Sequence, residues 1–384
     1  MTVGRQVVRE QVMLSGYTTL GLGGPAARFI EAGRDDEIVA AVRGADRAGE
    51  PVLVLGSGSN LVVADEGFPG TVVRVATRGV TIGAGGDGVT VAVAAGEDWD
   101  TLVERCVAEG LSGIECLSGI PGLTGATPIQ NVGAYGQEVA ETVVTVRAYD
   151  RLRDTVAKLA GADCGFGYRT SAFKRGTRVS QAAVRGSRRA ATDPAAATGR
   201  FVVLGVTFRL ARDPLSAPVG YAELARALGV GEGERVPLAD ARSAVLALRR
   251  GKGMVLDPAD PDTRSAGSFF TNPVLDRRQF AEVERRAAAR SGRPGERAGA
   301  PSFPAGDGLV KVPAAWLIEQ AGFAKGYPGN GGARISSKHT LALTNPGGAS
   351  TASLIGLARE IRNGVRQAFG VELVSEPVLV GAEL

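Results

Sequence analysis

The segment Gly56-Ser57-Gly58-Ser59-Asn60 consists of small residues and lies between two apolar runs that we expect to form strands. Small residues let successive backbone N–H groups converge on an anion, so this segment is suited to holding a pyrophosphate. It does not match Gly-x-Gly-x-x-Gly, because Leu61 stands where the third glycine belongs, and it lacks the Gly-Lys-Ser/Thr of a P-loop. On these residues alone, an ordinary structural turn is the alternative.

A second candidate binding segment is the glycine- and proline-rich run from Gly119 to Gly136, which also carries small hydroxyls and two amides. Connectors longer than about 12 to 15 residues without secondary structure are usually functional or disordered. The interleaved Ile, Leu, Val and Tyr argue against disorder. We therefore expect an ordered loop that lies against a ligand, with a structural connector as the alternative.

The reactive residue types exclude several kinds of chemistry. His339 is the only histidine, so a multi-histidine metal site is excluded and at most one residue is left for a Ser-His-Asp arrangement. Cys106, Cys116 and Cys164 include no Cys-x-x-Cys pair, which favours reduced thiols over a secreted disulfide framework. We expect no metal site and assign His339 no catalytic role.

Composition indicates a globular protein of two or three domains. The chain has 384 residues, 44% hydrophobic and 22% charged, with a formal net charge of +4. This excess is too small to imply a nucleic-acid or membrane surface. No apolar run approaches the 18 to 20 residues of a membrane span, and the amino terminus lacks a signal-peptide apolar segment. We expect a cytoplasmic monomer.

Hydrophobic periodicity predicts mixed helices and strands around these segments. A helix capped by Asp35 and ended by Gly49 precedes a buried strand at 51–55, and a strand at 61–65 stands where a Rossmann unit needs a helix. Further strands are expected at 71–75, 89–94, 143–149 and 201–210. Further helices are expected from Asp98 to Gly110, around Val245 and Leu248, at 313–322 and at 354–370.

A basic stretch from Arg175 to Arg200 separates two of the expected strands. Basic platforms for nucleic acid usually interleave aromatic residues, and this stretch has Phe173 and Phe201 only at its margins. We interpret it as a solvated insertion, with an anion- or nucleic-acid-binding segment as the alternative.

The ordered motifs resemble the UDP-N-acetylenolpyruvoylglucosamine reductase family. They are Gly56 to Asn60, Pro-Ile-Gln-Asn-Val-Gly-Ala-Tyr-Gly ending at Gly136, Phe166-Gly167-Tyr168-Arg169, Gly267-Ser268-Phe269-Phe270-Thr271-Asn272-Pro273 and Ser375-Glu376-Pro377. The resemblance covers nearly the whole chain. It implies an NADPH-dependent flavoenzyme of peptidoglycan precursor synthesis that acts on a UDP-sugar enolpyruvyl ether.

The resemblance also implies an α+β fold and a binding site for FAD. The expected architecture is a vanillyl-alcohol-oxidase/PCMH-like two-part FAD-binding region followed by an α+β substrate-binding domain. Both glycine-rich segments would contact FAD. The expected cofactor-binding residues are Gly56, Ser57, Gly58, Ser59, Asn60, Leu61, Gly119, Ile120, Pro121, Gly122, Gly125, Ala126, Thr127, Pro128, Gln130, Asn131, Gly133, Ala134 and Tyr135.

Three residues match the family's catalytic groups. Ser268 matches the proton donor, and a positioned hydroxyl can deliver a proton to the carbon beside the substrate carboxylate. Arg169 matches the arginine that stabilises the enolate-like intermediate, where a planar donor fork suits carboxylate oxygens. Glu376 matches the glutamate near the carboxyl terminus. Without the resemblance, these would be a turn serine, a surface ion pair and an exposed strand residue.

Substrate binding is expected from Tyr168, Tyr221, Lys252, Asn272 and Gln320. Tyr221 resembles the tyrosine that members with an added substrate-covering loop use against the diphosphate. The register of Arg249-Arg250-Gly251-Lys252 leaves open whether Lys252 or a neighbouring arginine contacts the diphosphate.

The expected domains are an FAD-binding subdomain at 1–78, completed by about 371–384, a second subdomain at 79–253 and a substrate-binding domain at 254–370. The second subdomain carries the insertion 175–200, about 20 residues longer than a short hairpin connection requires. A related flavin oxidase, a catalytically silent flavin-binding module and an RNA-associated protein are the competing interpretations.

Overall fold

The computed structural model describes residues 7–85, 88–174, 198–291 and 299–384. Its contacts divide the chain into two compact units. Unit 1 comprises Met1–Leu14, Gly24–Gly58 and Glu66–Leu256, and unit 2 comprises Ser15–Gly23, Ser59–Asp65 and Asp257–Leu384.

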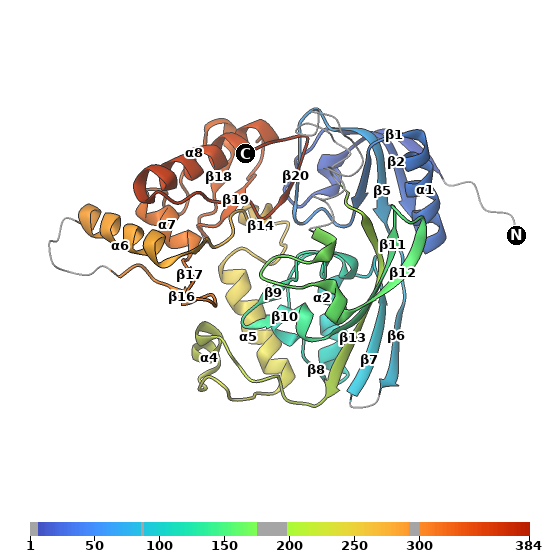
Figure 1. Cartoon of the computed structure of the whole chain (residues 1–384), viewed down its shortest axis with the longest axis horizontal. Coiled ribbons are helices and arrows are strands. Elements are labelled where there is room, and N and C mark those ends of the chain that lie inside the picture. Colours follow the sequence, from blue (N-terminus) through green and yellow to red (C-terminus); the bar gives the residue numbers. More distant parts are fainter. Residues whose placement is uncertain (1–6, 86–87, 175–197, 292–298) are drawn as a thin grey trace, which may run out of the picture. The chain divides into compact units, whose positions relative to one another are not determined.

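One sheet of unit 1 has the strand order β1-β2-β5-β3. Its strands are β1 (Val8–Met13), β2 (Pro25–Ala32), β3 (Val52–Leu55) and β5 (Phe68–Val75), and α1 (Asp35–Ala48) joins β2 to β3. β2, β5 and β3 run parallel, whereas β1 is antiparallel to β2. Figure 1 shows β1, β2 and β5 beside α1. The expected strands at 51–55 and 71–75 are both present.

α1 forms where the apolar spacing predicts it, with buried Ile38 and Val42 facing the sheet. Gly49 ends it in the left-handed conformation, at φ 69°. The prediction that Asp35 caps this helix is wrong. Arg34 occupies the N-cap position, and the Glu37 carboxylate accepts its backbone N–H at 3.2 Å, so Asp35 becomes the first helical residue.

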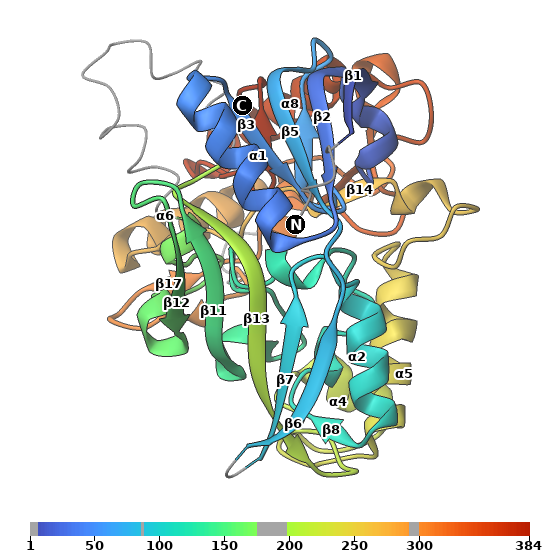
Figure 2. The same ribbon diagram turned by 90° about the vertical axis from the view of Figure 1, so that its right-hand side faces the viewer.

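The second sheet of unit 1 is antiparallel, with the order β12-β11-β13-β7-β6 (Figure 2). Its strands are β6 (Val80–Gly85), β7 (Gly88–Ala94), β11 (Val143–Asp150), β12 (Thr155–Ala160) and β13 (Phe201–Arg212), and β8 (Leu111–Ser112) pairs with the end of β13. Alternate residues such as Val91, Val146 and Phe208 point into a core shared with α2 (Trp99–Ala108). The Asp98 carboxylate caps α2 by accepting the Thr101 N–H at 2.9 Å, as its sequence position predicts.

Further described elements of unit 1 are the strands β9 (Gly133–Ala134) and β10 (Gln137–Glu138) and the helices α4 (Ala222–Leu228) and α5 (Leu238–Gly251). The β9–β10 hairpin lies within the glycine-rich loop region. α4 and α5 bury Leu224 and Val245 in a common cluster with Cys116. Tyr221 directly precedes α4 and Lys252 directly follows α5, so this cluster holds the two helices next to these residues.

In the part of the chain that the structure describes, unit 2 contains three small sheets and three α-helices. Its strands are β4 (Leu61–Val63), β14 (Ser265–Ser268), β15 (Val274–Leu275), β16 (Phe303–Pro304), β17 (Val310–Lys311), β18 (Arg334–Ile335), β19 (Ala342–Thr344) and β20 (Val378–Val380). Its helices are α6 (Arg277–Ser291), α7 (Ala314–Gln320) and α8 (Thr351–Phe369). The buried stripe of α8, from Leu354 to Phe369, forms the centre of its core.

The chain end lies in unit 2, where β20 pairs in parallel with β4. Residues 371–384 therefore pack with the strand that follows Gly56 to Asn60. Most of the basic insertion, 175–197, lies outside the described residues, and only its last three positions can be placed. The division into three domains stays a prediction.

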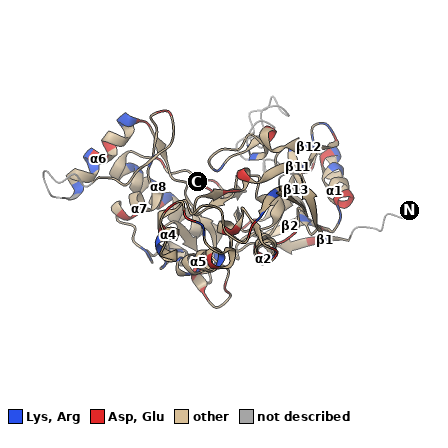
Figure 3. Cartoon of the chain, turned by 90° about the horizontal axis from the view of Figure 1, so that it is seen from below, with Lys and Arg blue, Asp and Glu red and all other residues tan. Residues whose placement is uncertain are grey.

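Charged side chains of both signs are interspersed on the helices. Figure 3 shows blue and red residues alternating along α1 and α6. α6 carries the Glu282–Arg286 ion pair at 2.5 Å. Within the described ranges, no helix is long and apolar enough to cross a bilayer.

Candidate active site

The segment from Gly56 to Asn60 forms the connection between β3 and β4, as expected. Gly58 adopts φ 64°, a conformation that favours glycine. A Cβ built on Gly56 would lie 3.5 Å from the Leu123 side chain, so this segment lies against the second glycine-rich loop. In the described part of the chain, the backbone N–H groups of Ser57 and Gly58 have no protein acceptor. Unbonded backbone N–H groups beside a glycine in the left-handed conformation fit the expected anion-binding segment.

The first half of the loop 119–136 is pinned to the start of α2. Gly119 N–H donates to the Asp100 carboxylate at 2.6 Å, and Gly125 N–H donates to the Ala95 carbonyl at 2.9 Å. A Cβ on Gly125 would lie 2.5 Å from the Ala95 Cβ, so no side chain fits there. The loop is therefore ordered, and its course depends on glycine.

The second half of the loop is organised by Asn131, which is buried and adopts φ 48°. Its Nδ2 donates to Glu138 Oε2 at 2.6 Å and to the Gly167 carbonyl at 3.3 Å, while its Oδ1 accepts the Ala140 N–H at 3.1 Å. These bonds use both N–H donors of the side-chain amide and one of the two acceptor positions of Oδ1. The amide nitrogen therefore has no N–H left to donate to a cofactor.

Arg169 is held against this loop. Its Nη2 donates to the Gly133 carbonyl at 2.8 Å and its Nη1 to the Asn131 carbonyl at 3.4 Å. Its guanidinium also lies 5.4 Å from the Tyr168 ring centroid. Both acceptors are neutral carbonyl oxygens, so these two contacts orient the cation without neutralising its charge.

Tyr135 and Tyr221 meet edge to face, with ring centroids 5.6 Å apart. Burial raises the pKa of Tyr135 to about 12 and also raises the pKa of Tyr221, so both phenols remain hydrogen-bond donors at neutral pH. Lys252 Nζ lies 5.7 Å from the Tyr135 ring and pairs with Glu223 Oε2 at 2.7 Å. The Lys252 charge is thus already compensated within the protein.

Arg249, on α5, is a site candidate that the sequence left unresolved. Its Nη2 donates to the Met254 carbonyl at 2.9 Å, whereas its buried Nε has no partner in the described part of the protein. Burial lowers the pKa of this guanidinium. Its Nε lies 3.4 Å from where a Cβ of Gly119 would stand. The sequence signal for a cation at this position was the basic cluster Arg249-Arg250-Gly251-Lys252. The sequence could not show which of these cations is buried.

In unit 2, the segments that carry Ser268 and Glu376 are hydrogen-bonded neighbours. Ser268 ends β14, and the next residue, Phe269, donates its N–H to the Leu341 carbonyl at 2.7 Å. The Phe269 carbonyl accepts the Glu376 N–H at 2.9 Å. The fold therefore brings together two residues that are more than a hundred positions apart in the sequence.

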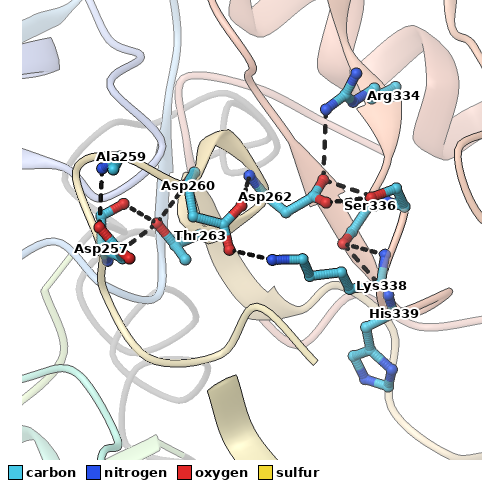
Figure 4. Close-up of polar contacts among 10 residues, drawn as sticks. Asp257, Ala259, Asp260, Asp262, Thr263, Arg334, Ser336, Lys338 and His339 are labelled. Atoms are coloured by element: carbon cyan, nitrogen blue, oxygen red, sulfur yellow. Dashed lines mark hydrogen bonds and ion pairs between the residues drawn. The ribbon is translucent and has the colours of Figure 1, made fainter. Parts of the chain in front are cut away.

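The segment that leads into β14 is locked by a polar network (Figure 4). The Asp262 carboxylate accepts the Ser337 N–H at 3.2 Å and lies 3.5 Å from Arg334 Nη2. Lys338 Nζ donates to Asp260 Oδ2 at 2.6 Å. His339 donates its backbone N–H to Ser336 Oγ at 3.3 Å, a bond that does not involve its imidazole.

Asn272 and Gln320 lie at opposite ends of α7, a helix roughly 10 Å long. The Asn272 Oδ1 accepts the Ala314 N–H at 2.9 Å at the start of that helix. Gln320 is exposed at the other end, and its carbonyl accepts a bond from Arg290 at 3.2 Å. Both belong to unit 2, whereas Arg169, Tyr168, Tyr221 and Lys252 belong to unit 1.

Comparisons with known proteins agree with this architecture. Residues 26–156 match an FAD binding domain, and residues 258–380 match the UDP-N-acetylenolpyruvoylglucosamine reductase C-terminal domain. The UDP-N-acetylenolpyruvoylglucosamine reductase of Thermobifida fusca is 57% identical over 98% of both chains, and that of Salinispora arenicola is 57% identical over 97% of this chain and 95% of its own. The crystal structure of UDP-N-acetylenolpyruvylglucosamine reductase from Thermus caldophilus has a TM-score of 0.59, with 24% identity, over 97% of this chain and 99% of that one.

The chain is an FAD-dependent oxidoreductase with a PCMH-like two-part FAD-binding region and a C-terminal α+β domain, which confirms the predicted fold class and cofactor. It belongs to the UDP-N-acetylenolpyruvoylglucosamine reductase family, as its motifs suggested. The individual site residues stay predictions. So does the absence of a metal, although no cluster of three His, Cys, Asp or Glu ligands occurs among the described residues.

Proposed function

We propose that this chain catalyses the NADPH-dependent reduction of UDP-N-acetylglucosamine enolpyruvate to UDP-N-acetylmuramate in peptidoglycan precursor synthesis. Family membership over nearly the whole chain supports this reaction. The observation that carries the residue assignment is the Glu376 N–H bond to the Phe269 carbonyl, because it joins the segments of the proposed glutamate and of Ser268.

FAD fits the two glycine-rich segments, because their small residues leave the backbone open to a ligand. At Gly125 there is no room even for a Cβ. We assign the pyrophosphate to the segment from Gly56 to Leu61, and the pyrophosphate and isoalloxazine to the loop residues from Gly119 to Tyr135. Bound FAD supplies hydride transfer, from NADPH to the terminal alkene carbon of the enolpyruvyl ether.

The protein must stabilise the negative charge that then spreads into the substrate carboxylate, and it must supply a proton. Arg169 is proposed to stabilise this charge, because bonds to the Asn131 and Gly133 carbonyls hold its planar guanidinium in a fixed orientation. Ser268 Oγ is proposed to deliver the proton to the carbon beside the carboxylate. Glu376 would hydrogen-bond the intermediate or orient this proton donor.

Tyr221 supports a diphosphate site, because a phenol with a raised pKa stays protonated and can donate a hydrogen bond to a phosphate oxygen. Between the candidate cations, the geometry favours Arg249. Its Nε has no described partner, whereas Lys252 pairs with Glu223. Tyr168, Asn272 and Gln320 are retained as substrate contacts. The proposal includes a cytoplasmic monomer without nucleic-acid or membrane partners.

The reaction can be tested by anaerobic mixing of the FAD-loaded protein, first with NADPH and then with the enolpyruvyl nucleotide sugar. NADPH should bleach the flavin, and the nucleotide sugar should restore its absorbance while UDP-N-acetylmuramate forms in a one-to-one ratio to NADPH. Restoration by oxygen alone, with no effect of the nucleotide sugar, would identify an oxidase instead. A flavin that NADPH does not bleach would indicate a catalytically silent protein.

A further inference from the structure

Glu115 is a fully buried carboxylate that has no cation beside it in the described part of the chain. It lies in a single 3-10 turn, Glu115–Leu117. Its oxygens accept three N–H groups: Oε2 accepts Gly113 N–H at 2.6 Å, and Oε1 accepts Gln137 Nε2 at 3.0 Å and Ala217 N–H at 2.6 Å. Burying a carboxylate is unfavourable unless hydrogen bonds satisfy it. The Glu115 carboxylate therefore fixes the positions of the three N–H groups that donate to it.

The Gln137 donor belongs to the hairpin of the second glycine-rich loop. Gln137 is buried in β10 and pairs with Ala134 of β9, next to Tyr135. Its side-chain oxygen accepts the Cys116 N–H at 2.8 Å, so this amide is bonded to both Glu115 and the residue after it. Glu115 therefore fixes the position of the hairpin that carries Tyr135.

The Ala217 donor belongs to the segment that leads to Tyr221. The backbone of this segment also pairs with residues 234–236. Ser216 N–H donates to the Val236 carbonyl at 2.7 Å, and Val219 N–H donates to the Glu234 carbonyl at 2.8 Å. Those bonds stay within residues 216–236. The bond to Glu115 joins the segment to the loop that precedes Gly119.

We propose that Glu115 is a positioning residue that holds the Tyr221 segment against the Tyr135 hairpin, so that Tyr221 is placed to bind the substrate's diphosphate. The edge-to-face contact of the two rings is the geometry that this arrangement maintains. The inference rests on the proposed function, because it assumes that Tyr221 contacts the diphosphate.

A glutamine at position 115 tests this role with almost no change in volume. A carboxylate only accepts hydrogen bonds, whereas a carboxamide presents an N–H₂ group on one side. All three groups that face Glu115 are donors, so at least one of them would then face another donor. The matched control is Glu232→Gln, which changes an exposed glutamate within residues 216–236 that is not placed in the site.

The experiment is a double-mutant cycle on the KM for the enolpyruvyl nucleotide sugar, using FAD-loaded Glu115→Gln, Tyr221→Ala and the double variant. Glu115→Gln should raise KM about tenfold, as expected for loss of a hydrogen bond to a charged group. In the Tyr221→Ala background, the same change should alter KM less than about twofold. Glu232→Gln should leave KM and kcat unchanged.

An equal rise in KM in both backgrounds, or no rise in either, would overturn the inference, because a general structural defect does not depend on Tyr221. If Tyr221→Ala alone leaves KM unchanged, the diphosphate role of Tyr221 fails and the inference falls with it. Should the glutamine variant not fold, Glu115→Asp keeps the carboxylate but withdraws it by one methylene. The same cycle then applies, and additivity would again reject the proposal.

Discussion

Glu376 donates its backbone N–H to the carbonyl of Phe269 at 2.9 Å, and this bond places Glu376 across from the residue that follows Ser268. Phe269 is almost fully buried and packs edge to face on Phe270, so the carbonyl has a rigid support. The proposed proton donor and the proposed catalytic glutamate thus depend on the same piece of backbone. Both proposed roles belong to flavin reoxidation by the substrate, which can be measured separately from flavin reduction by NADPH.

Ser268→Ala should block proton delivery while leaving flavin reduction by NADPH intact, because the proton is needed only after hydride reaches the alkene. Removing a positioned general acid typically costs about a hundredfold to ten-thousandfold, so flavin reoxidation by the substrate should slow on that scale. Anaerobic rapid-mixing absorbance separates the two steps. Ser243→Ala, on the exposed face of α5, is the control. Equal slowing of both half-reactions would show that Ser268 affects flavin placement instead.

Arg169→Lys should keep the positive charge but lose the planar fork that reaches the carbonyls of both Gly133 and Asn131. We expect flavin reoxidation by the substrate to slow roughly tenfold to a hundredfold, since one oriented donor is lost from the developing anion. Arg209→Lys, on an exposed position of β13, is the control. A reoxidation rate equal to that of the control would remove Arg169 from the proposed chemistry.

Gly125→Ala should weaken FAD binding, because the added Cβ would lie 2.5 Å from the Ala95 Cβ and 3.0 Å from its carbonyl oxygen. Overpacking of this kind costs about 1 to 3 kcal/mol, which corresponds to a loss of affinity of about fivefold to more than a hundredfold. Fluorescence titration of the apoprotein with FAD measures it. Gly44→Ala, in α1 with nothing within 4 Å of its Cβ, should bind FAD normally. Unchanged affinity of the Gly125 variant would show that the loop can shift without consequence.

Deleting residues 175–197 should leave FAD binding intact, whereas a deletion extended to residue 200 should destabilise unit 1. Arg200 Nη2 lies 2.5 Å from the Asp150 carboxylate, which is only 1% exposed, and Thr198 Oγ1 accepts the Val54 N–H at 2.7 Å. The full insertion expected from sequence, 175–200, therefore includes three residues that support the fold. Flavin content and thermal unfolding of the two deletions measure the difference. Equal loss of FAD in both would show that 175–197 is itself required.

The Asp150–Arg200 pair should also give unfolding a distinct pH dependence. Hydrogen bonding to Arg200 holds the pKa of Asp150 below its ordinary value of 3.8, so the folded state prefers the charged carboxylate. The stabilisation is present above the unfolded pKa and is lost as pH falls through the lower folded value. The stability difference between wild type and Arg200→Ala should therefore shrink as pH falls below about 4. Denaturant unfolding at several pH values tests this, and a difference that grows on acidification would contradict it.

Local sequence determined the elements whose signals are contained in a few turns of chain. α1, α2 and α8 lie where apolar spacing places them, and Gly49, Asp98 and Gly370 end or begin them as expected. The two glycine-rich segments could also be singled out, because their high content of glycine and other small residues is itself the signal. Side chains that repeat every 3.6 residues make one face of a helix, whatever that face packs against.

Tertiary structure decided the features that depend on distant partners. β12 has mostly exposed side chains, so it has no local apolar pattern to reveal it. β20 pairs with β4 across more than three hundred residues, and no local pattern could show that partner. Sequence could not show that Lys252 is neutralised by Glu223, or that the Arg249 Nε is buried without a described partner. Burial and ion pairing are set by which segments meet in space, and that depends on packing of the whole chain rather than on any window of it.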